Sequence, residues 1–127
     1  MNVTVVIPAY NEAKGIEKTL IELAEYVPKE YEILVIDDGS TDNTFEIVNG
    51  IGYSNIGCIQ HKKNKGYGSA ISTGCKHANG DIIVWYDADG QHRPEDLVAV
   101  VKKLKDEELD YCIGIRNERS HCDRNRK

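Results

Sequence analysis

The chain has 127 residues, 40% of them hydrophobic and 29% charged, and carries a formal net charge of −5. This length predicts a single domain with a real core, and the negative charge argues against a general nucleic-acid binder. No apolar run is long enough to span a membrane, no signal peptide is expected at the start, and four cysteines without C-x-x-C spacing indicate reduced structural thiols.

Apolar segments with two different periodicities alternate along the chain. Short apolar runs predict strands over residues 3–7, 31–36, 55–60, 82–86 and 111–115. Helices are expected through Ile16, Leu20, Leu23 and Val27, through Phe45 and Val48, over 69–78, and from Pro94 through Leu97, Val98, Val101 and Leu104. This alternation predicts a mostly parallel sheet with helices on both faces.

Local signals predict where several of these elements begin and end. Pro8 cannot donate a ladder hydrogen bond and is expected to close the first strand, and Asn11 is the predicted N-cap of the first helix. Pro94 stands at a first helical position. Residues 69–78 carry a face of small and apolar side chains, which predicts a helix packed closely on the sheet.

Polar turns follow four of the predicted strands, after Ile7, Ile36, Gln60 and Tyr86. Ligands of parallel sheets bind at the carboxyl ends of the strands, so we expect these four loops to form one site. The turn after the first strand lacks the glycines of a dinucleotide-binding fingerprint, and no P-loop pattern occurs. A nucleotide held by carboxylates and a bridging metal remains.

The turn after the most apolar strand reads D-A-D-G-Q. Asp87, Asp89 and Gln91 recur at a spacing of two, and carboxylate and amide oxygens suit a hard cation such as Mg²⁺ or Mn²⁺. A simple turn is the alternative, since Asp and Gly are favoured in turns. Asp38, at the end of the second strand, is expected either to accept hydrogen bonds from a ribose or base or to have a helix-capping or turn role.

Four motifs, V-V-I-P-A-Y-N-E, V-I-D-D-G-S-T-D-N-T, N-K-G-Y-G-S-A and Y-D-A-D-G-Q-H, resemble those of family 2 glycosyltransferases, especially the dolichyl- or polyprenyl-phosphate mannosyltransferase group. The resemblance implies the α/β GT-A nucleotide-diphospho-sugar transferase fold, Rossmann-like, with a mostly parallel sheet and helices on both faces. It also implies a C-terminally truncated chain, because relatives continue beyond this point. Residues 1–116 would form the nucleotide-sugar-binding domain, and 117–127 a basic tail that begins the acceptor region.

The same resemblance implies an inverting transferase that uses a GDP- or UDP-sugar. The residues implied to contact the nucleotide sugar are Pro8, Ala9, Tyr10, Glu12, Ile36, Asp38, Lys65, Gly68, Asp87 and Ala88. Asp89 and Gln91 are implied to hold Mg²⁺ or Mn²⁺, and Asp87, Asp89 and Arg116 are implied to act in catalysis. The acceptor would be a polyprenyl phosphate, whose ionised oxygen needs no general base, or a saccharide hydroxyl, which needs one.

Two further functions stay open on the sequence. A binding module would hold nucleotide and metal without turnover, and a hydrolase would pair two carboxylates such as Glu12 and Asp38. Residues 116–127 carry five basic and two acidic side chains and form either a solvated end or a contact with anionic lipid. We expect a cytoplasmic protein at the cytoplasmic face of the membrane, with self-association through the last strand, 111–115.

Overall fold

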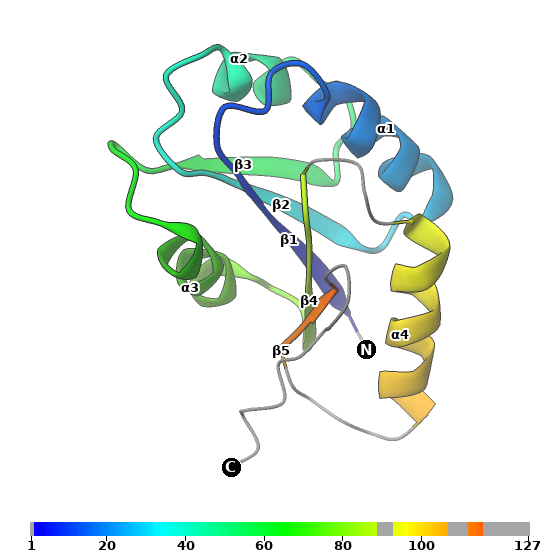
Figure 1. Cartoon of the computed structure of the whole chain (residues 1–127). Coiled ribbons are helices and arrows are strands. Elements are labelled where there is room, and N and C mark those ends of the chain that lie inside the picture. Colours follow the sequence, from blue (N-terminus) through cyan, green and yellow to red (C-terminus); the bar gives the residue numbers. More distant parts are fainter. Residues whose placement is uncertain (1, 89–92, 107–111, 116–127) are drawn as a thin grey trace.

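The structure is a computed structural model that describes residues 2–88 and 93–106 and the backbone of 112–115. Strands and helices alternate along this part of the chain (Figure 1). The elements are β1 (Val3–Ala9), α1 (Ile16–Tyr26), β2 (Glu32–Asp37), α2 (Thr44–Asn49), β3 (Ile56–Gln60), α3 (Tyr67–His77), β4 (Ile82–Tyr86), α4 (Pro94–Asp106) and β5 (Cys112–Ile115).

The five strands form one parallel sheet in the order β3-β2-β1-β4-β5. The central strand β1 pairs with β2 on one side and β4 on the other, so that Val5 lies opposite both Ile33 and Val84. Because the chain order reverses between β1 and β4, this is the point of the sheet where ligands bind in such folds. The predicted parallel α/β sheet is confirmed.

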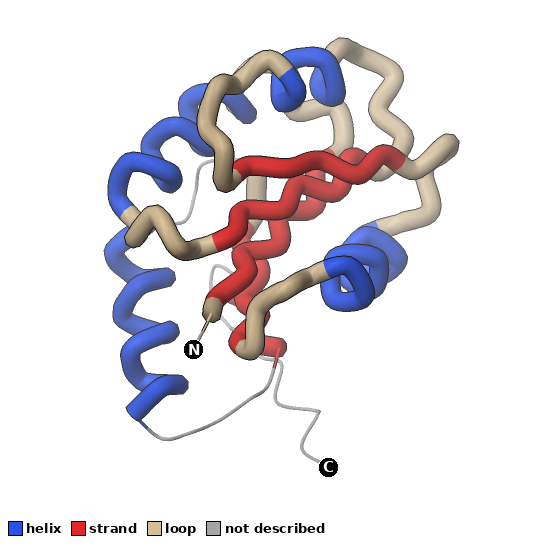
Figure 2. The backbone as a smooth tube through the Cα atoms, turned by 180° about the vertical axis from the view of Figure 1, so that it is seen from behind, coloured by secondary structure: helices blue, strands red, loops and turns tan. Residues whose placement is uncertain are grey.

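Helices cover both faces of the sheet (Figures 1 and 2), with α1, α2 and α4 on one face and α3 on the other. The larger core lies under α1, α2 and α4 and includes Val5, Leu20 and Leu97. The smaller core lies under α3, where Val6 and Ala70 pack together. Successive residues of β1 point to opposite faces, and both faces are covered, which explains why the strand reads as a continuous apolar run.

The close approach of α3 to the sheet depends on a glycine. A Cβ on Gly74 would lie 2.2 Å from Cγ1 of Val6, which is too close for two carbon atoms that are not bonded to each other. Ala70, one turn earlier on the same face, is fully buried. The prediction that small residues let this helix pack closely on the sheet is confirmed.

The prediction that Pro8 closes the first strand is wrong, because β1 continues to Ala9. The carbonyl of Ala9 points towards β2, where it accepts a hydrogen bond from the N–H of Asp38. Backbone groups of successive residues point to opposite sides of a strand, so the backbone nitrogen of Pro8 points towards β4. Pairing with β4 ends at Val6 opposite Trp85. The missing N–H of Pro8 therefore costs no ladder bond.

The predicted N-cap at Asn11 is also wrong, because α1 begins only at Ile16, after Gly15. Asn11 adopts a φ of 54°, in the left-handed region that Asn tolerates better than most residues. Its side-chain carbonyl accepts hydrogen bonds from the N–H groups of Thr41 and Asp42. The side chain thus joins two loops instead of capping a helix.

In the described ranges, no helix combines the length and the apolar character that a membrane crossing requires.

Candidate functional site

A pocket of about 280 Å³ opens at the carboxyl edge of the sheet, where the ends of β1, β2 and β4 meet the start of α3. It is lined by Pro8, Ala9, Tyr10, Glu12, Asp38, Asn64, Gly66, Tyr67, Ala70, Asp87 and Ala88. Residues far apart in the sequence therefore meet at the edge where the polar turns predicted a site.

Seven of the ten residues expected to contact a nucleotide sugar line this pocket: Pro8, Ala9, Tyr10, Glu12, Asp38, Asp87 and Ala88. The other three do not line it. Ile36 is fully buried in the core beneath α3, Lys65 is exposed on the loop before that helix, and Gly68 is exposed in its first turn. Asp89, Gln91 and Arg116, together with the tail 117–127, lie outside the described residues.

Hydrogen bonds between loops hold the β1 end of the pocket. The backbone N–H of Glu12 donates to Oγ1 of Thr44, 3.0 Å away, and the N–H of Ala13 donates to Oδ2 of Asp42 at 3.3 Å. Along the chain, Tyr10 stands between the end of β1 and the two residues that donate these bonds. Its side chain lines the pocket and is 44% exposed. The loop after β2 therefore fixes where Tyr10 and Glu12 stand.

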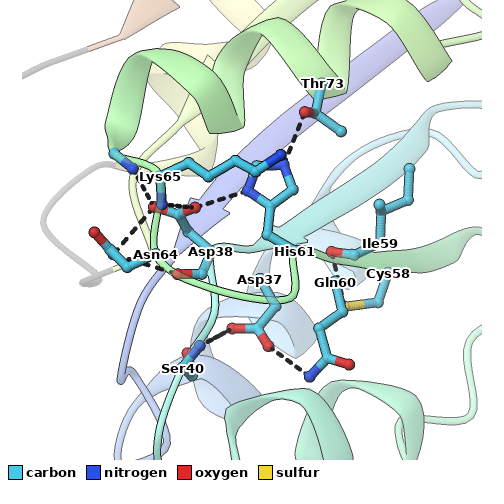
Figure 3. Close-up of polar contacts among 11 residues, drawn as sticks. Asp37, Asp38, Ser40, Cys58, Ile59, Gln60, His61, Asn64, Lys65 and Thr73 are labelled. Atoms are coloured by element: carbon cyan, nitrogen blue, oxygen red, sulfur yellow. Dashed lines mark hydrogen bonds and ion pairs between the residues drawn. The ribbon is translucent and has the colours of Figure 1, made fainter.

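Asp38 is only 4% exposed, and both of its carboxylate oxygens accept hydrogen bonds (Figure 3). Nδ1 of His61 lies 2.7 Å from Oδ1, and the N–H of Lys65 donates to the same oxygen at 3.0 Å. Oδ2 accepts the N–H of Gly66 at 2.8 Å and the side-chain amide of Asn64 at 3.1 Å. These bonds fasten the β3–α3 loop to the end of β2.

The alternative that Asp38 caps the next helix is wrong, because α2 begins at Thr44, after Asn43. Burial alone would raise the pKa of Asp38, but hydrogen bonds from Lys65, His61 and Gly66 outweigh this effect and hold the pKa below its ordinary value. Asp38 is therefore ionised at neutral pH and gives the pocket a fixed negative charge.

A second carboxylate lines the pocket from the end of β4. Asp87 is partly buried, and its Oδ1 accepts a hydrogen bond from the hydroxyl of Tyr67 at 3.3 Å. Tyr67 begins α3 and is 38% exposed. Within the described ranges, no three His, Cys, Asp or Glu side chains are grouped to hold a metal ion, and Asp87 is the member of the D-A-D-G-Q turn whose carboxylate the structure describes.

The sequence interpretation missed four residues of the pocket wall, namely Asn64, Gly66, Tyr67 and Ala70. It also missed His61, which lies behind the wall. A sequence signal was present for two of them, since Asn64 and Gly66 stand two apart in a turn just before a helix. In the structure Gly66 has a φ of 104°, which favours glycine. The residues of this loop that were expected to contact the nucleotide sugar are Lys65 and Gly68.

The fold and the pocket define a GT-A-type α/β protein. The structure is similar to the mannosyltransferase PcManGT from Pyrobaculum calidifontis in complex with GDP-Man and Mn²⁺, with a TM-score of 0.70 and 33% identity. The match covers 80% of this chain and 32% of that one. The family model named glycosyl transferase family 2 matches residues 4–127, and the chain belongs to that family, as its motifs predicted.

Two relatives have dolichyl phosphate in their names. The UDP-N-acetylglucosamine–dolichyl-phosphate N-acetylglucosaminyltransferase of Methanococcus voltae is 35% identical over 129 residues, which cover 87% of this chain and 50% of the relative. The dolichyl-phosphate beta-glucosyltransferase ALG5C of Trichomonas vaginalis is 38% identical over 112 residues, covering 80% of this chain and 33% of the relative. The chain thus spans half or less of the length of these relatives. Its expected likeness to dolichyl-phosphate glycosyltransferases is confirmed.

Proposed function

We propose that this chain binds the nucleotide sugar of a family 2 glycosyltransferase that passes the sugar, with inversion, to a polyprenyl phosphate. The observation that carries this proposal is the pocket at the sheet edge, where Asp38 and Asp87 come from separate strand ends and Tyr10 and Tyr67 present exposed rings. The dolichyl-phosphate acceptors in the names of two relatives support the choice of acceptor.

The described residues of the pocket suit a nucleotide. Tyr10 and Tyr67 offer aromatic surface for a base or sugar ring, and the ionised Asp38 holds Asn64 and Gly66 in the pocket wall beside them. Relatives and similar structures carry both kinds of donor in their names, UDP-N-acetylglucosamine in one case and GDP-Man in another. The donor class we propose is therefore a UDP- or GDP-sugar.

A divalent cation fits the donor set of the D-A-D-G-Q turn, since its carboxylate and amide oxygens are the ligands that Mg²⁺ and Mn²⁺ prefer. We assign Asp89 and Gln91 to the cation and Asp87 to the donor. Bound there, the cation would stabilise the charge that develops on the departing diphosphate. Arg116 would bind phosphate, and the hydroxyl of Tyr67 orients the carboxylate of Asp87.

The hydrolase alternative loses support from the state of Asp38. A glycosidase needs one carboxylic acid with a raised pKa that can protonate the leaving oxygen. The pKa of Asp38 is lowered, and its two oxygens accept hydrogen bonds from loop groups. Asp38 is therefore not that acid, and because its carboxylate already accepts four hydrogen bonds it is not placed to act as the ionised partner either.

Titration calorimetry with UDP and GDP, each with Mn²⁺ or with EDTA, tests donor binding. We expect binding that depends on the cation and loses this dependence in Asp89→Ala. Equal affinity in Mn²⁺ and in EDTA would contradict the metal assignment. A transfer assay with UDP- and GDP-sugars and a polyprenyl phosphate then separates a transferase from a module that binds without turnover.

A further inference from the structure

His61 is a buried side chain that the proposed chemistry does not use. It follows the last residue of β3 and is 8% exposed. Its ring lies between Asp38 and Thr73 (Figure 3), with Nδ1 2.7 Å from Oδ1 of Asp38 and Nε2 2.8 Å from Oγ1 of Thr73. Both ring nitrogens therefore have a partner.

The roles of the two nitrogens follow from their partners. An ionised carboxylate only accepts hydrogen bonds, so Nδ1 carries the proton that is donated to Asp38. The hydroxyl of Thr73 can donate to Nε2, so a neutral ring satisfies both contacts. Thr73 belongs to α3 and Asp38 follows β2. The ring of His61 thus ties the end of a strand to the helix that carries one wall of the pocket.

The carboxylate that His61 contacts also holds the pocket wall. Asp38 accepts hydrogen bonds from the backbone of Lys65 and Gly66 and from the side chain of Asn64, and Asn64 and Gly66 line the pocket. The loop after β2 and the β3–α3 loop are in tight contact, because a Cβ on Gly39 would lie 2.3 Å from the carbonyl carbon of Lys63. A rotation of the Asp38 carboxylate would break its hydrogen bonds to Asn64, Lys65 and Gly66 together.

We propose that His61 is a positioning residue that fixes the carboxylate of Asp38, and through it the β3–α3 loop, in the arrangement that receives the nucleotide. The role in nucleotide binding rests on the proposed function, whereas the effect on the loop does not. Hydrogen bonds to charged groups are about twice as strong as neutral ones, so loss of the His61 bond to Asp38 has a larger effect than loss of the bond to Thr73.

Two substitutions separate the two hydrogen bonds. In His61→Asn, the side-chain amide takes the place of Nδ1 and keeps a donor toward Asp38. In His61→Gln, the amide reaches the place of Nε2 and keeps a partner for Thr73 but not for Asp38. Thr73→Val removes the hydroxyl with little change of shape and is the matched control for the second bond.

Amide hydrogen exchange measured by NMR, at a temperature where every variant is folded by circular dichroism, tests the loop directly. We expect the N–H groups of Lys65 and Gly66 to exchange about tenfold faster in His61→Gln, and close to the wild-type rate in His61→Asn and Thr73→Val. Equal rates in the Asn and Gln variants, whether changed or not, would overturn the proposal, since they would show that the ring only fills space.

Calorimetry with UDP and GDP in Mn²⁺ tests the consequence for binding. We expect Kd to rise about tenfold in His61→Gln and to stay within about threefold of wild type in His61→Asn. Faster exchange without any change in Kd would overturn the role of His61 in nucleotide binding. If the wild-type chain binds neither nucleotide, the proposed donor site is wrong, while the exchange rates still decide whether His61 positions the loop.

Discussion

At the scale of single residues, Asp38 determines how acid affects the protein. Its pKa is lower in the folded chain than in the unfolded one, where an Asp titrates near 3.9. The stability that it contributes is therefore fully present above about pH 4 and is lost as the pH falls through the lower folded value.

We expect Asp38→Asn to reduce the free energy of unfolding at pH 7 by about 1.5–3 kcal/mol, because hydrogen bonds to a charged acceptor are lost. The difference from wild type should shrink as the pH falls below about 4, where the carboxylate becomes protonated in the unfolded chain while it is still ionised in the folded one. Urea denaturation followed by circular dichroism at pH 7 and in steps down to pH 3 measures this. A difference that stays constant with pH would show that the charge of Asp38 is not what stabilises the loop.

Tyr67 offers a second test at a single atom. Tyr67→Phe removes the hydroxyl that donates to Asp87, and we expect nucleotide binding in Mn²⁺ to weaken by about 0.5–1.5 kcal/mol. The matched control is Tyr53→Phe, which removes a hydroxyl bonded to Glu25 at 2.7 Å, away from the pocket wall. Calorimetry on both variants should show a loss only for Tyr67→Phe, and equal losses would assign the effect to general destabilisation.

At the scale of elements, α3 carries one wall of the pocket and depends on contact with the sheet. Gly74→Ala places a methyl group 2.2 Å from Val6, and we expect a loss of about 1–3 kcal/mol in the free energy of unfolding from overpacking. Gly68→Ala lies in the same helix, where no atom comes within 4 Å of a new Cβ, and should stabilise the protein by about 0.5–1 kcal/mol. Urea denaturation of the two variants checks both signs, and a stabilising Gly74→Ala would mean that the helix can move away from β1.

At the scale of the whole molecule, charge is unevenly distributed along the chain. The net charge is −5, yet residues 116–127 carry five basic side chains against two acidic ones. This segment lies outside the described residues, so its contact with a membrane stays a prediction. Self-association through the last strand also stays a prediction.

We expect the full chain to bind vesicles of anionic lipid at low salt and a chain ending at Ser120 to bind them less. The shorter chain lacks three basic residues, Arg124, Arg126 and Lys127, and each contributes about 1 kcal/mol of attraction near an anionic surface. Co-sedimentation at low and physiological salt, with neutral vesicles as the control, measures this. Equal partition of the two chains would show that the distal residues are not the membrane contact.

The fold class, the helices and strands of the described part, and the edge of the sheet that holds the pocket could all be predicted from the amino-acid sequence. Apolar periodicity is a local property, and parallel strands place their carboxyl ends together whatever the loops do. The motifs also determined the family, because their residues recur in a recognisable order. Element ends were less accurate, as the extension of β1 past Pro8 shows.

The roles of the polar loop residues could not be predicted, because they depend on contacts between distant parts of the chain. Asn11 joins a loop 30 residues away instead of capping α1, and Asp38 receives its partners from a loop 23 to 28 residues further along the chain. His61 could not be identified in advance, because its role depends on Asp38 and Thr73 lying on opposite sides of its ring. Such hydrogen bonds form between loops that the sheet order β3-β2-β1-β4 brings together, and no periodicity within a single loop encodes them.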